Sequence, residues 1–109
     1  MIDAPEILKH LRAVVAVKGA DYVYSEEACR YAINDQPACI VGHVYARLGL
    51  LDQATCDSDT QAWSLHTYEI TLFGRDVLRA AQQVQDGVLG ERGTWGEALV
   101  AAEGIRRDR

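Results

Sequence analysis

Cys39 and His43 are the two residues whose types and spacing could do chemistry, because they lie one helical turn apart between Pro37 and Gly49. The partial positive charge at a helix N-terminus favours a thiolate, and a neighbouring imidazole could act as its base. Two residues four apart on one helix nevertheless point outward in parallel, which is a poor geometry for a nucleophile and its base. His66 is the alternative base. The simpler interpretation, which we favour, is that Cys39 is a small buried residue with a structural role.

The same residues could also contribute to a zinc site. Cys29, Cys39 and His43 would supply three ligands, and Cys56 or His66 the fourth. Structural zinc sites typically use paired ligands two to four residues apart, and this sequence has no such pair. We therefore expect neither a metal nor another cofactor, and the zinc site stays an alternative.

The segment from residue 37 to 48 reads as one short central helix with two different sides. At 100° per residue its bulky residues fall on one arc and its small residues on the opposite strip, with His43 and Arg47 between them. The bulky arc holds Ile40, Val41, Val44, Tyr45 and Leu48, and the small strip holds Cys39, Gly42 and Ala46. His43 and Arg47 are therefore predicted to lie at the exposed or ligand-facing edge.

Three further residues are candidates for binding. Gln82 and Gln85 could present a polar recognition surface, while Asp86 before Gly87 is more simply a helix stop. Trp95 would mark an interface if exposed, and a core anchor if buried; the core anchor is the simpler interpretation.

Composition excludes several function classes. The chain has 109 residues and a formal net charge of -5, which argues against a general nucleic-acid binder. It has no apolar run long enough for a membrane span or a signal peptide. Three cysteines in a chain without an export signal fit a reducing cytoplasm, and residues 104–109 read as a frayed basic tail.

The sequence predicts a single α+β domain over residues 1–109, small and mainly helical. We expect a helix over residues 4–18 with a capping box from Asp3 and Glu6, then a short β-hairpin at about residues 21–34 and the central helix over 37–48. Residues 50–70 fit a short helix, which we favour, while Tyr68, Ile70 and Leu72 alternate like a strand. Thr71 begins a longer helix that ends near Asp86, and Thr94 begins the last one with a second capping box.

Three sequence segments carry a resemblance to known proteins. They are Cys-Ile-Val-Gly-His at residues 39–43, Gln-Asp at 85–86 and Thr-Trp-Gly-Glu-Ala at 94–98. With these, the chain resembles a group of small uncharacterised proteins from actinobacteria and their phages over residues 20–102. The resemblance implies a cytoplasmic accessory protein and carries no catalytic residue. A second resemblance, of Cys39 to Gly42 with Tyr45, is to cysteine peptidases of the cell-wall amidase type.

These observations lead to one preferred function and two alternatives. The preferred function is a non-enzymatic protein-binding or regulatory module, with a protein partner or a second copy of the chain and with neither nucleic acid nor membrane as its target. The first alternative is a thiol-dependent hydrolase with Cys39 as nucleophile, and the second is a small structural zinc protein.

Overall fold

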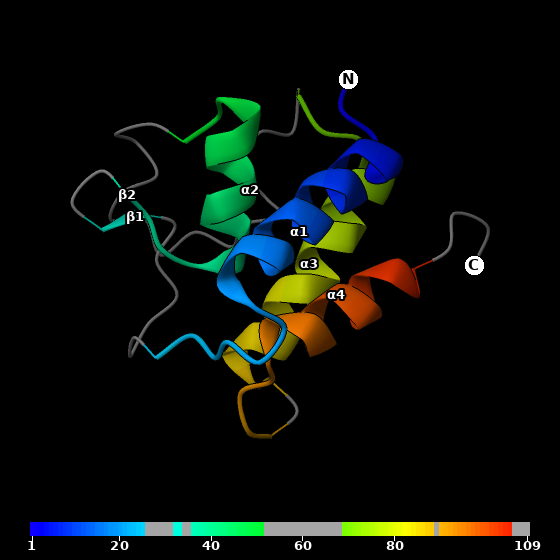
Figure 1. Cartoon of the computed structure of the whole chain (residues 1–109). Coiled ribbons are helices and arrows are strands. Elements are labelled where there is room, and N and C mark those ends of the chain that lie inside the picture. Colours follow the sequence, from blue (N-terminus) through cyan, green and yellow to red (C-terminus); the bar gives the residue numbers. More distant parts are fainter. Residues whose placement is uncertain (26–31, 34–35, 52–68, 89, 106–109) are drawn as a thin grey trace.

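A computed structural model describes residues 1–25, 32–33, 36–51, 69–88 and 90–105 of the chain. These residues form a mainly helical domain with four helices (Figure 1): α1 over Ala4–Lys18, α2 over Ile40–Leu48, α3 over Leu72–Asp86 and α4 over Trp95–Glu103. Helices α3 and α4 make the most extensive contact, and α1 packs on α2, α3 and α4. The prediction of a small, mainly helical domain is confirmed.

The starts of α1 and α3 are joined, although they are far apart in sequence. Ile2 bridges to Ile70, and the Ile2 N–H donates to the carbonyl of Glu69 at 2.7 Å. The Asp3 carboxylate accepts from the Ala4 N–H and from the Thr71 hydroxyl, which is 2.6 Å away. Asp3 is thus the predicted N-cap of α1, but it caps the helix without the predicted reciprocal bond from Glu6.

The start of α4 is held against the segment that follows α1. Thr94 and Glu97 form the predicted capping box, and the Gly96 N–H donates to the Ala20 carbonyl at 2.9 Å. A Cβ on Gly96 would lie 2.8 Å from both the Cβ and the carbonyl oxygen of Ala20. Glycine therefore permits this close approach, which fixes the position of Trp95 beside the end of α1.

One core lies among the helices. It is built from aliphatic residues of every helix together with Tyr24, Tyr45 and Trp95. Its largest fully buried side chains are Trp95, Tyr45, Ile7, Leu11, Ile40, Ile70, Leu78, Gln85, Val41, Val44 and Val77. The bulky arc predicted for α2 therefore faces the core, with Leu48 partly buried at its end.

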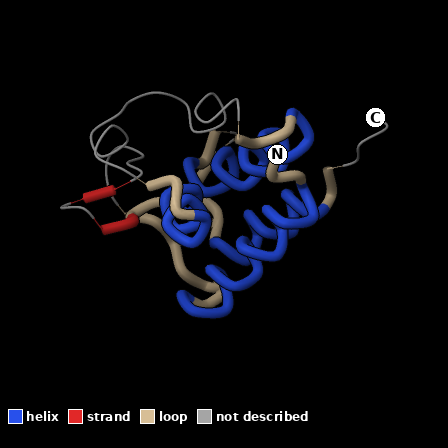
Figure 2. The backbone as a smooth tube through the Cα atoms, turned by 90° about the horizontal axis from the view of Figure 1, so that it is seen from above, coloured by secondary structure: helices blue, strands red, loops and turns tan. Residues whose placement is uncertain are grey.

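The predicted hairpin at residues 21–34 is wrong in the part that the structure describes. Residues 22–24 form no strand, and the paired strands are instead β1, Ala32–Ile33, and β2, Gln36–Pro37, which run antiparallel at the edge of the helical body (Figure 2). Two residues per strand are too few to form a sheet layer. The aromatic residues Tyr22 and Tyr24 serve packing, since Tyr24 is buried and Tyr22 contacts Trp95.

The predicted start of α2 is also corrected. The helix begins at Ile40, after the N-cap Cys39, and not at Pro37, because Pro37 is used in β2. Its predicted end is confirmed: Gly49 adopts a left-handed conformation with φ of 74°. The short helix predicted within residues 50–70 falls mostly on residues outside the described ranges.

Candidate functional site

The first turn of α2 places Cys39 in a structural position. Its side chain has no exposed surface, and its Sγ accepts a hydrogen bond from the Gly42 N–H at 3.3 Å. A sulfur atom thus takes the N-cap role that a serine or threonine hydroxyl usually fills. Gly42 is buried beside it, whereas Ala46, the third member of the predicted small-residue strip, is exposed. The thiol therefore lies inside the protein.

The glutamines predicted as a recognition surface are buried, so they present no exposed polar surface. Gln85 has no exposed area, and its Oε1 accepts from the Ile40 N–H at 2.7 Å. The first N–H groups of a helix lack partners within the helix, and Gln85 satisfies one of them from α3. Gln82 is 4% exposed, and its Oε1 has no hydrogen-bond partner in the described structure. The role of Gln85 is thus to join α3 to α2.

Trp95 is a core anchor and not an exposed interface residue. It has no exposed surface, and its Nε1 makes no hydrogen bond to the described residues. Its ring meets the ring of Tyr22 edge-on, with centroids 4.6 Å apart, and that of His43 edge-on at 5.4 Å. Such edge-to-face arrangements are favourable for aromatic rings. Trp95 therefore packs against His43.

His43 is half-buried between the core and solvent. Burial lowers the pKa of His43 below its usual value, and the positive charge of Lys18 lowers it further. Its imidazole is accordingly neutral at neutral pH, and neither ring nitrogen has a hydrogen-bond partner among the described residues. A neutral imidazole offers one donor and one acceptor to a ligand.

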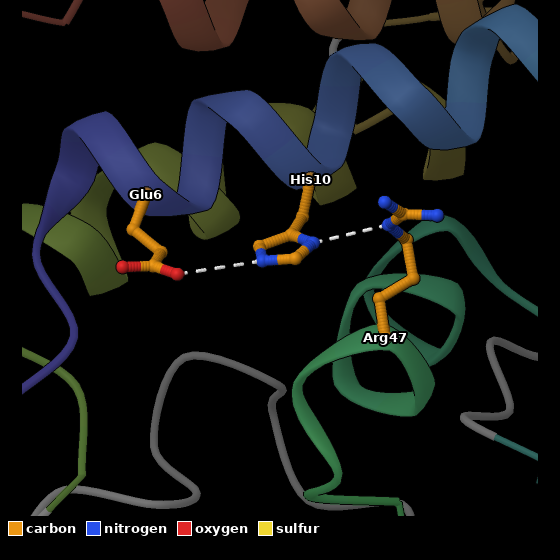
Figure 3. Close-up of polar contacts among 3 residues, drawn as sticks. All are labelled: Glu6, His10 and Arg47. Carbon is orange, nitrogen blue, oxygen red and sulfur yellow. Dashed lines mark hydrogen bonds and ion pairs between the residues drawn. The ribbon is translucent and has the colours of Figure 1, made fainter.

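Arg47 is fixed by a contact that the sequence did not indicate. Its Nε donates to Nδ1 of His10 at 3.0 Å, and Nε2 of His10 lies 3.6 Å from the Glu6 carboxylate (Figure 3). Only 13% of the His10 side chain is exposed, so this histidine is part of the contact between α1 and α2. The spacing of Glu6 and His10 along α1 is visible in the sequence, but Arg47 is 37 residues away.

Lys18, His43 and Arg47 come together around a cleft between α1 and α2. The cleft has a volume of about 280 Å³. It is lined by Ala13, Val14, Val17, Lys18, Pro37, His43, Ala46 and Arg47. Two cations and a neutral imidazole therefore surround an apolar floor, and none of the described lining residues carries a carboxylate.

The alternative catalytic pair, Cys39 and His43, makes different contacts in the structure. The Cys39 thiol faces the Gly42 N–H, His43 packs on Trp95, and the described residues show no hydrogen bond between Cys39 and His43. Tyr45, which belongs to the resemblance to cysteine peptidases, is buried. Burial, together with the nearby Cys39 and Glu69, raises the pKa of Tyr45 well above its usual value.

The remaining candidates for catalysis and metal binding are only partly described. His66, Cys29 and Cys56 lie outside the described residues, so the structure describes only Cys39 and His43 of the ligands of the alternative zinc site. Within residues 1–25, 32–33, 36–51, 69–88 and 90–105, no group of three or more His, Cys, Asp or Glu side chains is arranged to hold a metal ion.

A larger groove lies between α3, α4 and the connection that joins them. Its volume is about 510 Å³. Its lining is mostly small and aliphatic, with Glu91 and Glu97 as its charged residues; Val84, Val88, Ala101 and Ile105 are among the others. None of the described residues that line it is a histidine, a cysteine or a cation, so they offer less chemistry than the residues of the smaller cleft.

Comparisons with protein-family models, with curated proteins and with solved structures gave no match to this chain. In the described part of the chain, none of the helices has the length and apolar character needed to cross a membrane.

Proposed function

We propose that this protein is a small non-enzymatic binding or regulatory module of an actinobacterium or its phage, that it acts in the bacterial cytoplasm, and that it binds its protein partner through the α1–α2 cleft. The observation that carries the proposal is the convergence of Lys18, His43 and Arg47 on one cleft. The residues come from two helices, so the surface depends on the folded protein and not on one segment.

The charges of the cleft support a role in binding. Arg12 forms an ion pair with Glu103 at 2.9 Å, and Arg79 with Asp76 at 3.1 Å. Lys18 and Arg47 form no such pair with a carboxylate of the described residues. In a chain with a net charge of -5, two cations on one cleft that pair with no carboxylate of the described residues are suited to a partner of opposite charge.

The apolar part of the cleft supports the same role. Val17 is 81% exposed at its edge, and the floor is formed by Ala13, Val14 and Ala46. Protein interfaces commonly combine an apolar centre with arginine and a polar rim. The cleft has this combination, whereas Cys39 has no access to a substrate.

Photo-crosslinking from the cleft tests this function. The full chain would carry benzoylphenylalanine in place of Val17 and, as a matched control, in place of Leu72, which is 72% exposed beside the N-terminal end of α1. In cells of the source organism, we expect a discrete crosslinked protein from position 17, its yield lowered by Arg47→Glu, and no such product from position 72.

The crosslinked products also show whether the partner is a second copy of the chain or a different protein. A crosslink between two copies of the chain would make the module a homodimer, and a crosslink to a different protein would identify that partner. Equal patterns from positions 17 and 72, or a pattern that Arg47→Glu leaves unchanged, would contradict the proposed function.

A further inference from the structure

The size of the α1–α2 cleft limits what it could hold. Small-molecule sites generally have volumes of about 300–1,000 Å³ and enclose most of their ligand. At about 280 Å³, and with Val17 exposed at its edge, the cleft has room for one or two side chains of a partner. A protruding part of a peptide fits it better than a nucleotide or another large cofactor.

The nitrogen atoms around the cleft define the chemistry of that side chain. The contact of the Arg47 Nε with His10 orients the guanidinium and leaves its two terminal amino groups without a partner among the described residues. Terminal amino groups of an oriented guanidinium are strong donors to a carboxylate. Lys18 adds a second positive charge, with its Nζ 5.4 Å from the centroid of the Tyr22 ring.

His43 completes this set as a neutral hydrogen-bonding group. Its ring is held in place by Trp95, so the imidazole needs little further ordering when a ligand binds. The apolar floor beside it suits the methylene groups that carry a carboxylate in aspartate and glutamate. The hydrogen-bond donors, the positive charge and the apolar floor of the cleft therefore all suit the side chain of an aspartate or a glutamate.

We infer that the α1–α2 cleft recognises an acidic peptide segment of the partner, with an Asp or Glu carboxylate bound by Lys18 and Arg47 and its methylene groups packed beside His43. This inference rests on the proposed function and adds the chemistry of the partner. His10 is a positioning residue in this site, because it acts through Arg47.

An NMR titration of the full chain tests the inference. The probes are blocked hexaglutamate, with blocked hexalysine and hexaglutamine as matched peptides. We expect saturable shifts of the Lys18, His43 and Arg47 amides with hexaglutamate alone, and weaker binding as salt is raised, because salt screens exposed charges.

Three single-charge variants separate the cleft from general electrostatic attraction. Lys18→Gln and Arg47→Gln should each weaken hexaglutamate binding by about threefold to tenfold, in line with the loss of one partly exposed charged contact. Arg79→Gln changes the net charge equally at a residue outside the cleft, and it should leave the affinity within about a factor of two. Folding of each variant is checked by its amide spectrum.

Several results would overturn the inference. They are the absence of saturable hexaglutamate binding, equal weakening by Arg79→Gln, and shifts confined to the α3–α4 groove. Binding of a blocked phosphoserine peptide with no binding of hexaglutamate would also overturn it. If crosslinking from position 17 still identifies a partner in that case, the proposed function stands and only its acidic ligand is wrong.

Discussion

The buried first turn of α2 and its outer edge lie side by side, yet they use polar groups for opposite purposes. At the first turn, Cys39 and, from α3, Gln85 have no exposed surface, and each accepts a hydrogen bond from an N–H group of α2. At the outer edge, His43 and Arg47 keep hydrogen-bonding atoms that the described residues do not use. Burial and hydrogen bonding, more than residue type, therefore decide which groups of one helix are free to bind a partner.

The largest expected effect is on the buried side, in Gln85→Leu. The change leaves the Ile40 N–H buried with no acceptor, and it should lower the free energy of unfolding by about 1–3 kcal/mol. Gln83→Leu is the matched control on the exposed face of α3, with an expected change within about 0.5 kcal/mol. Urea unfolding of both variants measures the difference, and equal losses would show that the Gln85 contact has no special role.

A second prediction contrasts two positions of α2 that are one turn apart. Gly42→Leu adds a large side chain to a buried position, and we expect overpacking of about 1–3 kcal/mol, reduced by roughly 1 kcal/mol of improved helix propensity. Ala46→Leu, at the exposed edge, should leave thermal stability nearly unchanged and obstruct the cleft. A Gly42→Leu protein as stable as the wild type would remove the argument for close packing at the first turn.

Cys39 gives a smaller effect of the same kind. Cys39→Ala removes the sulfur that accepts from the Gly42 N–H, and it should cost about 0.5–1 kcal/mol, within the range for the loss of an N-cap. Cys39→Ser keeps an acceptor at this position and should recover part of the loss. Partner binding should be intact in both variants. Loss of binding with the fold preserved would assign Cys39 to the binding surface.

The smallest expected effect is a pH dependence at the outer edge. The pKa of His43 is lowered in the folded protein, mainly by burial, so below the unfolded-state value of 6.5 the unfolded chain takes up the proton first. Stability due to His43 is therefore full above pH 6.5 and is lost as the pH falls from there through the folded-state pKa. Comparing wild type with His43→Gln by urea unfolding between pH 8 and pH 5 isolates this change. An identical pH dependence in the two proteins would contradict the burial of His43.

Local signals in the sequence were sufficient to predict most helix ends. Thr71, Thr94 and Gly49 act on backbone groups within a few residues, so their roles follow from spacing alone. The sequence predicts a start of α2 at Pro37, before the observed start at Ile40, because Pro37 suits a first helical turn as well as it suits the β2 position that it occupies. Local propensity does not distinguish these two uses.

The sequence predicts the part of the candidate site that lies on one helix, but not the contacts between helices. His43 and Arg47 share one helix edge, and a 3.6-residue period reveals this. His10 and Gln85 act on residues 37 and 45 positions away, and such contacts exist only once the helices pack. Glutamine is usually exposed, so the burial of Gln85 had no signal in the sequence.

The most direct test of the contrast between the two sides of α2 is the native-state alkylation rate of Cys39 near neutral pH. Peptide mapping by mass spectrometry follows Cys39 separately from Cys29 and Cys56, with the urea-unfolded chain as the reference. We predict that Cys39 reacts far more slowly in the folded protein than in the unfolded chain, because its thiol is buried. Rapid alkylation of Cys39 in the folded state, faster than in the unfolded chain, would reveal an accessible, activated thiolate and contradict the buried, structural position of Cys39.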